Sequence, residues 1–357
     1  MIASLHIIGS RELGGAERWF LRFITALAAA GSPVQALVRG TSELALAQPK
    51  HLTLATLPMR TVWDPLSRWQ VSRFALRSTA PIVQTYMGRA TRLTHLPRGR
   101  GKVHVARLGG YYKLAPFRHA HVWIGNTRGL CDWMIQQGLS AQQVFHITNF
   151  AEPARPVPRS EIDRLRSRIA AREDDWLILH PARFVKVKGH DTLLEAFARL
   201  PAQIDGRRLR LILLGDGGLR DELLARARQL AIDERVVWAG WQRDPAPWFH
   251  LCDMVVFPSR DEETLGNVVL EAWAYARPLV ATRFRGAREI VRPDEDAVLV
   301  PCGDASALAG AIAETIRSGE RRATLVANGL QRIERDFSEP VIVGQYQALY
   351  AKLAANL

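Results

Sequence analysis

Two glutamates separated by seven residues lie where a loop runs into a helical pattern. Glu263 follows Pro258 and Ser259, directly after an apolar run, and Glu271 lies about one turn inside the helix expected from residue 267. A carboxylate beside apolar residues needs hydrogen-bond partners, and sugar or ribose hydroxyl groups are suitable donors. Two ordinary acidic residues near a helix N-terminus are the alternative. That alternative explains Glu263 better than Glu271.

Two cations, Arg183 and Lys188, share a loop that follows the apolar run at 176–180. The guanidinium group of an arginine can bind two oxygens at once, and a lysine adds a compact positive charge. Together they suit a diphosphate, whereas a solvated basic loop is the alternative.

Two further segments could present backbone N–H groups to an anion. Gly14 and Gly15 follow a strand-like run at 2–8 and open a helix, and Gly266, Asn267 and Val268 open the helix that carries Glu271. Free N–H groups at a helix start attract anions. A Gly-Gly pair before a helix is also a common turn, so this feature alone is weak.

Short β-branched runs alternate with longer helical patterns along the chain, which predicts βαβ units and parallel sheets. The expected strands cover residues 2–8, 34–38, 52–56, 82–85, 103–106, 121–124, 144–147, 176–180, 209–214, 236–239, 254–257, 279–281 and 297–300. The expected helices cover residues 16–30, 191–200, 219–230, 267–276, 305–318 and 340–357.

The length of 357 residues and a proline cluster predict two domains. Pro153, Pro156 and Pro158 read as a linker between two α/β halves. Two open parallel sheets of this kind create a cleft where the carboxyl ends of their strands face each other.

The composition excludes several classes of protein. With 48% hydrophobic and 23% charged residues, the chain is neither disordered nor a coiled coil. It contains no apolar run of about 18 residues, so no transmembrane helix is expected, and its first nine residues are too short for a signal peptide. Cys131, Cys252 and Cys302 match neither a disulfide framework nor a zinc spacing, which favours a cytoplasmic protein.

The positive charge is confined to the first half of the chain. The formal net charge is +13, and residues 1–155 contain 19 Lys and Arg against 6 Asp and Glu, whereas the remainder contains 29 of each sign. A one-sided field favours an anionic partner such as nucleic acid, an anionic membrane or a phosphorylated acceptor. An arginine-rich proteome that raises the count is the alternative.

The glutamate pair resembles the Glu-x7-Glu signature of retaining glycosyltransferases of family 4, which have the GT-B fold. Other segments resemble the family's motifs in the same order along the chain. They are Gly14-Gly15-Ala16-Glu17, the Arg183 and Lys188-Gly189 pair, Leu213-Leu214-Gly215-Asp216-Gly217 and Gly286-Ala287-Arg288-Glu289. The resemblance spans nearly the whole chain and is strongest over 176–300.

The resemblance implies two Rossmann-like domains, an acceptor-side domain at 1–155 with the helix 340–357 crossing back to it, and a nucleotide-sugar domain at 156–339. It implies a hexose-type sugar moved from a UDP- or GDP-linked donor to an acceptor hydroxyl. Arg183 and Lys188 would bind the diphosphate, Glu263 would face the transferred sugar, and Glu271 would hold the ribose. The backbone of Gly266, Asn267 and Val268 would meet the phosphate.

The chain departs from the family at one position. Many members carry a histidine near the reaction centre, in a segment that here reads Arg107-Leu108-Gly109-Gly110-Tyr111-Tyr112. A backbone group, Tyr111 or Tyr112 is left to take its place.

The expected chemistry requires no metal or other cofactor. The only Asp-x-Asp triplet, Asp294-Glu295-Asp296, lies in a proline-led turn that we expect to be solvated, and Arg183, Lys188 and helix N-termini can meet the charge of the leaving diphosphate instead. The first half has few carboxylates to act as a general base. This scarcity favours retention, in which the leaving phosphate takes the acceptor proton.

A basic, aromatic stretch in the first half indicates a membrane partner. Residues 60–77, helical from Pro65, combine Trp63, Trp69 and Phe74 with four arginines. Such a segment can lie on an anionic membrane, although buried aromatic rings with solvated arginines are an equal alternative. On the membrane hypothesis the acceptor is a lipid-linked or lipopolysaccharide-core saccharide, and the protein is peripheral on the cytoplasmic membrane face.

Three other functions are alternatives for this sequence. A sugar phosphorylase or a nucleotide-sugar epimerase would use the same fold, and would differ in needing inorganic phosphate or in needing no acceptor. A non-catalytic nucleic-acid-binding protein would leave both residue pairs without a role, and the chain contains no nucleic-acid-binding motif.

Overall fold

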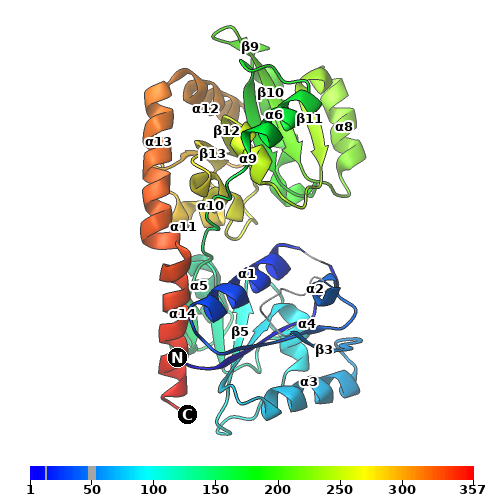
Figure 1. The fold of residues 1–357 in the computed structure, drawn as a ribbon, viewed down its shortest axis with the longest axis vertical. Coiled ribbons are helices and arrows are strands. Elements are labelled where there is room, and N and C mark those ends of the chain that lie inside the picture. Colours follow the sequence, from blue (N-terminus) through cyan, green and yellow to red (C-terminus); the bar gives the residue numbers. More distant parts are fainter. Residues whose placement is uncertain (13, 47–53) are drawn as a thin grey trace. The chain divides into compact units, whose positions relative to one another are not determined.

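The computed structural model describes residues 1–12, 14–46 and 54–357 and divides the chain into two compact units (Figure 1). The first unit consists of Met1–Asn149 and Glu339–Leu357, and the second of Phe150–Ser338. The second unit therefore begins a few residues before the expected proline linker. The cleft between the two halves stays a prediction.

A parallel sheet of seven strands forms the first unit, in the order β3-β2-β1-β4-β5-β6-β7. Its strands are β1 (Ser4–Ile8), β2 (Val34–Arg39), β3 (Leu54–Leu57), β4 (Ile82–Tyr86), β5 (Val103–Leu108), β6 (Val122–Gly125) and β7 (Val144–His146). Its helices are α1 (Gly15–Ala29), α2 (Glu43–Leu46), α3 (Pro65–Arg77), α4 (Met87–Leu93), α5 (Arg128–Gln136) and α14 (Glu339–Ala354). Residues 52 and 53 of the strand expected at 52–56 lie outside the described residues.

Buried polar side chains fasten α14 to the first sheet. The hydroxyl of Tyr350 donates to Gln84 Oε1 at 2.8 Å, and Arg107 Nε donates to the hydroxyl of Tyr346 at 2.9 Å. Both tyrosines are almost completely buried, so their hydroxyl groups need these partners. The last helix is therefore part of the first unit, as the GT-B resemblance implies.

The second unit contains a parallel sheet in the order β11-β10-β8-β12-β13-β14, to which β9 adds one antiparallel pairing with β10. Its strands are β8 (Trp176–Pro181), β9 (Gln203–Ile204), β10 (Arg207–Leu214), β11 (Val236–Gly240), β12 (Met254–Phe257), β13 (Leu279–Thr282) and β14 (Val298–Val300). Its helices are α6 (Arg159–Arg168), α7 (His190–Arg199), α8 (Arg220–Gln229), α9 (Ala246–Leu251), α10 (Asn267–Ala274), α11 (Arg285–Ile290), α12 (Ala305–Arg317) and α13 (Gly319–Arg332).

The helix α13 was not expected from the sequence, and its packing explains why it forms. A Cβ atom on Gly329 would lie 2.5 Å from the indole of Trp273 in α10, so the missing side chain lets the two helices approach closely. Ser318 caps the helix by accepting a hydrogen bond from Arg321 N. In the part of the chain that the structure describes, no helix is long and apolar enough to span a membrane.

Candidate functional site

The two adjacent strands β8 and β12 bring Lys188 and Glu263 together. Lys188 ends a short 3-10 helix, Lys186–Lys188, that follows β8, and Glu263 lies in the loop that follows β12. Lys188 Nζ donates to Glu263 Oε2 at 2.5 Å, and Ser259 Oγ donates to the same oxygen at 3.3 Å. The two charged side chains are only 19% and 14% exposed. An ion pair with so little solvent contact fixes both side chains at the carboxyl edge of the sheet, where ligands of open α/β sheets bind.

The backbone holds the two loops in contact. Arg260 N donates to Val187 O at 2.8 Å. Gly189 has a φ of +67°, and a Cβ atom there would lie 2.0 Å from the carbonyl oxygen of Pro258. Only glycine satisfies both the left-handed conformation and this close approach. The glycine after Lys188 therefore fixes the position of the lysine.

Arg183 is exposed and lies on the same loop as Lys188. A glycine turn after β10 supports its backbone, because Cβ atoms on Gly215 and Gly217 would lie 2.0 Å and 2.7 Å from the carbonyl oxygens of Ala182 and Phe184. The sequence did not reveal this supporting role. A glycine that follows the adjacent strand is the signal that could have indicated it.

The start of α10 has the geometry that its glycine predicts. Gly266 is the residue before the helix and has a φ of +74°, and a Cβ atom there would lie 2.5 Å from the ring of Phe284. Asn267 and Val268 begin the helix, and Val268 is buried. Glu271 lies in the same helix with a half-buried side chain.

Aromatic side chains underlie the lysine. Lys188 Nζ lies 5.2 Å from the ring centre of Phe257, and the rings of His180 and His190 meet edge to face at 4.5 Å. Burial lowers the pKa of His190 to about 4 and holds the pKa of His180 well below its usual value. Both histidines are therefore neutral at pH 7 and add no charge to the site. Neither histidine was predicted from the sequence to lie at this site.

The remaining predicted residues lie in the first unit. Gly14 precedes α1, and its N–H donates to Glu17 Oε2 at 2.9 Å, so a carboxylate of the chain itself occupies this N–H. Gly15 is exposed. After β5, Tyr111 packs edge to face on Trp133, and Tyr112 stacks on Phe117 and is 37% exposed.

The acidic turn after α11 differs from its expectation. Asp296 is 1% exposed and pairs with Arg292 at 2.8 Å and Arg332 at 3.6 Å. The prediction of a solvated turn was wrong for Asp296, because its ion pairs with two arginines offset the cost of burying the carboxylate. Over the described residues, no group of three or more His, Cys, Asp and Glu side chains could hold a metal ion.

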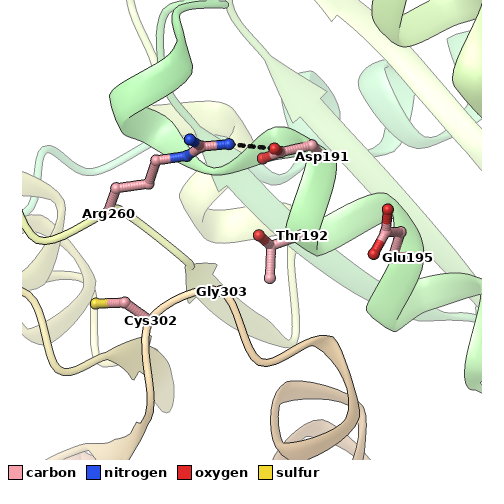
Figure 2. Close-up of a pocket in the computed structure, with 6 residues that line it drawn as sticks. All are labelled: Asp191, Thr192, Glu195, Arg260, Cys302 and Gly303. Atoms are coloured by element: carbon pink, nitrogen blue, oxygen red, sulfur yellow. Dashed lines mark hydrogen bonds and ion pairs between the residues drawn. The ribbon is translucent and has the colours of Figure 1, made fainter.

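An open pocket of about 400 Å³ lies beside the loop that carries Glu263 (Figure 2). Its lining residues are Asp191, Thr192, Glu195, Arg260, Cys302 and Gly303. Arg260 forms an ion pair with Asp191 of α7 across its rim. None of the predicted site residues lines this pocket.

Comparison with known proteins identifies the family of this chain. Residues 161–332 match the family described as glycosyl transferases group 1. The lipopolysaccharide core biosynthesis glycosyltransferase LpsE of Rhizobium meliloti is 32% identical over 349 residues, which cover 95% of this chain and 96% of LpsE. The chain belongs to the group 1 glycosyl transferases. A second relative, the lipopolysaccharide core biosynthesis glycosyltransferase LpsD of the same organism, is 28% identical over 99% of both chains.

Solved structures of glycosyltransferases share the fold. Anabaena Alr3699/HepE, determined in complex with UDP and glucose, matches with a TM-score of 0.82 over 99% of this chain and 100% of that chain, at 21% identity. WaaG, a glycosyltransferase involved in lipopolysaccharide biosynthesis, matches with a TM-score of 0.71 over 99% and 98% of the two chains, at 17% identity. This group 1 glycosyl transferase therefore has the α/β, two-domain GT-B fold that the sequence predicted.

Proposed function

We propose that this glycosyltransferase is a retaining enzyme of family 4 that moves a hexose-type sugar from a UDP- or GDP-linked donor to a lipopolysaccharide-core or other lipid-linked saccharide. The pairing of Lys188 with Glu263 at the carboxyl edge of the second sheet is the observation that carries the proposal. The names of LpsE and LpsD support the acceptor class. UDP and UDP-glucose in the Anabaena structures support the donor class.

In this proposal the ion pair opens when the donor binds. The diphosphate takes Glu263's place beside Lys188, and Arg183 on the same loop binds further phosphate oxygens. Glu263 is then free to accept a hydrogen bond from a hydroxyl of the transferred sugar. Glu271 binds the ribose, while the backbone of Gly266, Asn267 and Val268 contacts the phosphate.

The same cations carry the chemistry without a metal ion. Negative charge develops on the leaving diphosphate, and fixed positive groups stabilise it because they need no reorganisation during the reaction. The acceptor oxygen bonds to the anomeric carbon on the face from which the diphosphate leaves, so the anomeric configuration is retained. As the bond between the sugar and the diphosphate breaks, the leaving phosphate takes the proton of the acceptor hydroxyl, so no separate base is required. No other cofactor enters this scheme.

Nucleotide binding to matched variants tests the donor site. Lys188→Gln should weaken binding of UDP or GDP about tenfold or more, measured by titration calorimetry, because a charge-assisted bond to phosphate is lost. Lys186→Gln is the control, since Lys186 is exposed on the same 3-10 helix. Equal losses in both variants would contradict the site.

Product analysis tests the reaction itself. With a nucleotide-hexose and lipopolysaccharide core, NMR of the product should show the anomeric configuration of the donor, and EDTA should leave the rate unchanged. A product that needs inorganic phosphate would indicate a phosphorylase, and conversion without acceptor would indicate an epimerase.

We also propose that α3 contacts an anionic membrane on the cytoplasmic side. Trp63, Leu66 and Trp69 are 74%, 51% and 56% exposed, so the alternative of a buried aromatic core fails for these side chains. Arg92 lies 3.5 Å from the ring centre of Trp63 and Arg73 lies 5.0 Å from that of Trp69. Exposed indoles beside arginines match the membrane interface, where rings enter the headgroup region and cations meet anionic lipids.

Vesicle binding tests this surface. Trp69→Ala should reduce cosedimentation with vesicles rich in phosphatidylglycerol at low salt. Leu46→Ala is the control, because Leu46 is an exposed apolar side chain of α2. Wild-type protein that ignores such vesicles and glycosylates only soluble acceptors would exclude the membrane role.

A further inference from the structure

Four arginines mark the carboxyl ends of four neighbouring strands in the first unit. Arg39 is the last residue of β2, and Arg11, Arg60 and Arg89 each follow the last residue of β1, β3 and β4 by three positions. These strands are adjacent and parallel in the order β3-β2-β1-β4. Their carboxyl ends therefore share one edge of the sheet, and we call Arg11, Arg39, Arg60 and Arg89 the arginine edge.

The side chains of Arg39 and Arg89 donate to one short piece of backbone, which includes the carbonyl oxygen of Arg60. Arg89 Nη1 donates to the carbonyl oxygens of Met59 at 3.2 Å and Arg60 at 3.0 Å, and Arg39 Nη2 donates to the same Arg60 oxygen at 3.3 Å. Met59 has a φ of +42°, a left-handed conformation that a side chain disfavours. Backbone strain of this kind is concentrated at functional sites.

Within residues 1–12, 14–46 and 54–357, none of the four arginines forms an ion pair with a carboxylate. Asp64 is the carboxylate that the charge of Arg60 reaches: the hydrogen bond from Ser67 and, after it, the charge of Arg60 lower the pKa of Asp64. Burial and the charges of Arg89 and Arg11 lower the pKa of Arg39. The Arg39 side chain is buried, at 4% exposure, and its Nε has no hydrogen-bond partner. A buried cation with an unused donor is costly unless an anion is supplied from outside.

We propose that the arginine edge binds a phosphate group carried by the acceptor saccharide. A phosphate monoester has close to two negative charges and three acceptor oxygens, which can satisfy several guanidinium groups at once, whereas a carboxylate has one charge and two oxygens. The inference rests on the proposed transferase function for the identity of the acceptor. The binding of phosphate itself does not depend on that function.

Inorganic phosphate tests the site without any transfer reaction. Titration calorimetry at constant ionic strength would compare Arg60→Gln with Arg100→Gln, an exposed arginine of the same unit. Both would be made in the Lys188→Gln background, which weakens binding of phosphate at the donor loop. Arg60→Gln should bind phosphate about tenfold more weakly than Arg100→Gln. Equal affinities in the two variants would overturn the proposal.

Arg60 and Arg11 are exposed, so their variants are expected to fold. Arg11→Gln provides a second, independent loss of charge at the same edge. It should also weaken phosphate binding. An unchanged affinity for phosphate in both Arg60→Gln and Arg11→Gln would contradict the site.

The source of the phosphate is tested with the acceptor. Lipopolysaccharide core before and after removal of phosphate by aqueous hydrogen fluoride would be compared as acceptors. For the wild type, KM should rise about tenfold on dephosphorylation with little change in kcat, and Arg60→Gln should not distinguish the two acceptors. If Arg60→Gln instead reduces only binding to phosphatidylglycerol vesicles, the phosphate belongs to a lipid headgroup and the acceptor assignment is wrong.

The two proposals can fail separately. Absence of transfer to either acceptor would count against the proposed function, while the phosphate titration would still decide whether the arginine edge is an anion site. Normal transfer with equal KM for both acceptors would exclude acceptor phosphate binding and leave the transferase intact.

Discussion

Cations have different partners in the two units of this chain. In the second unit many cations pair with carboxylates, as Arg208 does with both oxygens of Asp175 at 2.8 Å and Lys188 does with Glu263, although Arg210 donates to carbonyl oxygens. In the first unit, Lys102 Nζ donates to two carbonyl oxygens, and Arg39 and Arg89 of the arginine edge donate to carbonyl oxygens as well. A ligand of the second unit must displace an internal carboxylate. On the proposal above, a ligand of the arginine edge supplies negative charge to arginines that form no ion pair within the described residues.

The first unit also contains more buried histidines, which predicts that acid unfolds it before the second unit. Burial lowers the pKa of His6 to about 3 and holds that of His104 well below 6.5. Burial, followed by the charge of the stacked His119, lowers the pKa of His95 to about 4. These groups are neutral when folded and take up protons when unfolded. These histidines therefore do not lower the free energy of unfolding above pH 6.5. Below that pH the free energy of unfolding declines as the pH falls from 6.5 towards 4.

The expected loss is large. Below pH 6.5, each fully buried histidine lowers the free energy of unfolding by up to about 1.4 kcal/mol per pH unit. The combined loss from several such histidines is comparable to the free energy of unfolding of a typical domain, about 5–15 kcal/mol. Hydrogen exchange followed by mass spectrometry at pH 7.5 and pH 5, corrected for intrinsic rates, should show greater loss of protection in the first unit. The second unit has only His180 and His190 of this kind among its described residues. Earlier loss there would contradict the comparison.

The interlocked loops of the second unit predict a strong effect of one methyl group. Gly189→Ala should destabilise the protein by about 3–5 kcal/mol in urea, because the new Cβ atom meets the Pro258 carbonyl in a left-handed conformation. Gly206→Ala is the control, since Gly206 has a φ of +76° but no atom within 4 Å of the added carbon. It should cost about 1–2 kcal/mol, the conformational cost alone. Similar losses in both variants would show that loop contact is unimportant.

The sequence predicted what depends on local pattern. Apart from β9, the strands of both sheets and the position of Glu263 in the loop before α10 follow from short-range signals, since each residue type marks its own strand end or helix start. The partner of Glu263 did not follow, because Lys188 lies 75 positions away and only the adjacency of β8 and β12 brings the two together.

The arginine edge shows the same limit more clearly. Each arginine is visible after its strand, but their convergence depends on the strand order β3-β2-β1-β4, which spacing does not determine. The helix α13 was missed although its own sequence is amphipathic, so a local signal was present. Its close approach to α10 through Gly329 and Trp273, like the convergence of the arginines, depends on long-range packing.

A double-mutant cycle tests whether the cations of the second unit are stabilised by their carboxylates. Lys188→Met and Glu263→Gln should each lose about 1–3 kcal/mol, and the double variant should lose about 1–2 kcal/mol less than their sum, because each single change leaves the partner without its ion pair. The exposed Arg159–Asp163 pair is the reference. Its coupling should stay within about 0.5 kcal/mol. Equal coupling in the two pairs would mean that burial adds nothing to Lys188–Glu263.

The smallest effect concerns a neutral partner of a cation in the first unit. Tyr346→Phe removes the hydroxyl that accepts from Arg107 Nε, while Arg107 Nη2 keeps its bond to Asn149 Oδ1 at 2.5 Å. The loss should be about 1–2 kcal/mol, because a buried charged donor is left without one acceptor. Tyr112→Phe, at a partly exposed position, should change urea stability by less than about 0.5 kcal/mol. If Tyr346→Phe and Tyr112→Phe have the same stability in urea, hydrogen bonds from cations to neutral oxygens contribute little to the stability of this unit. The difference between the two units would then be one of geometry and not of energy.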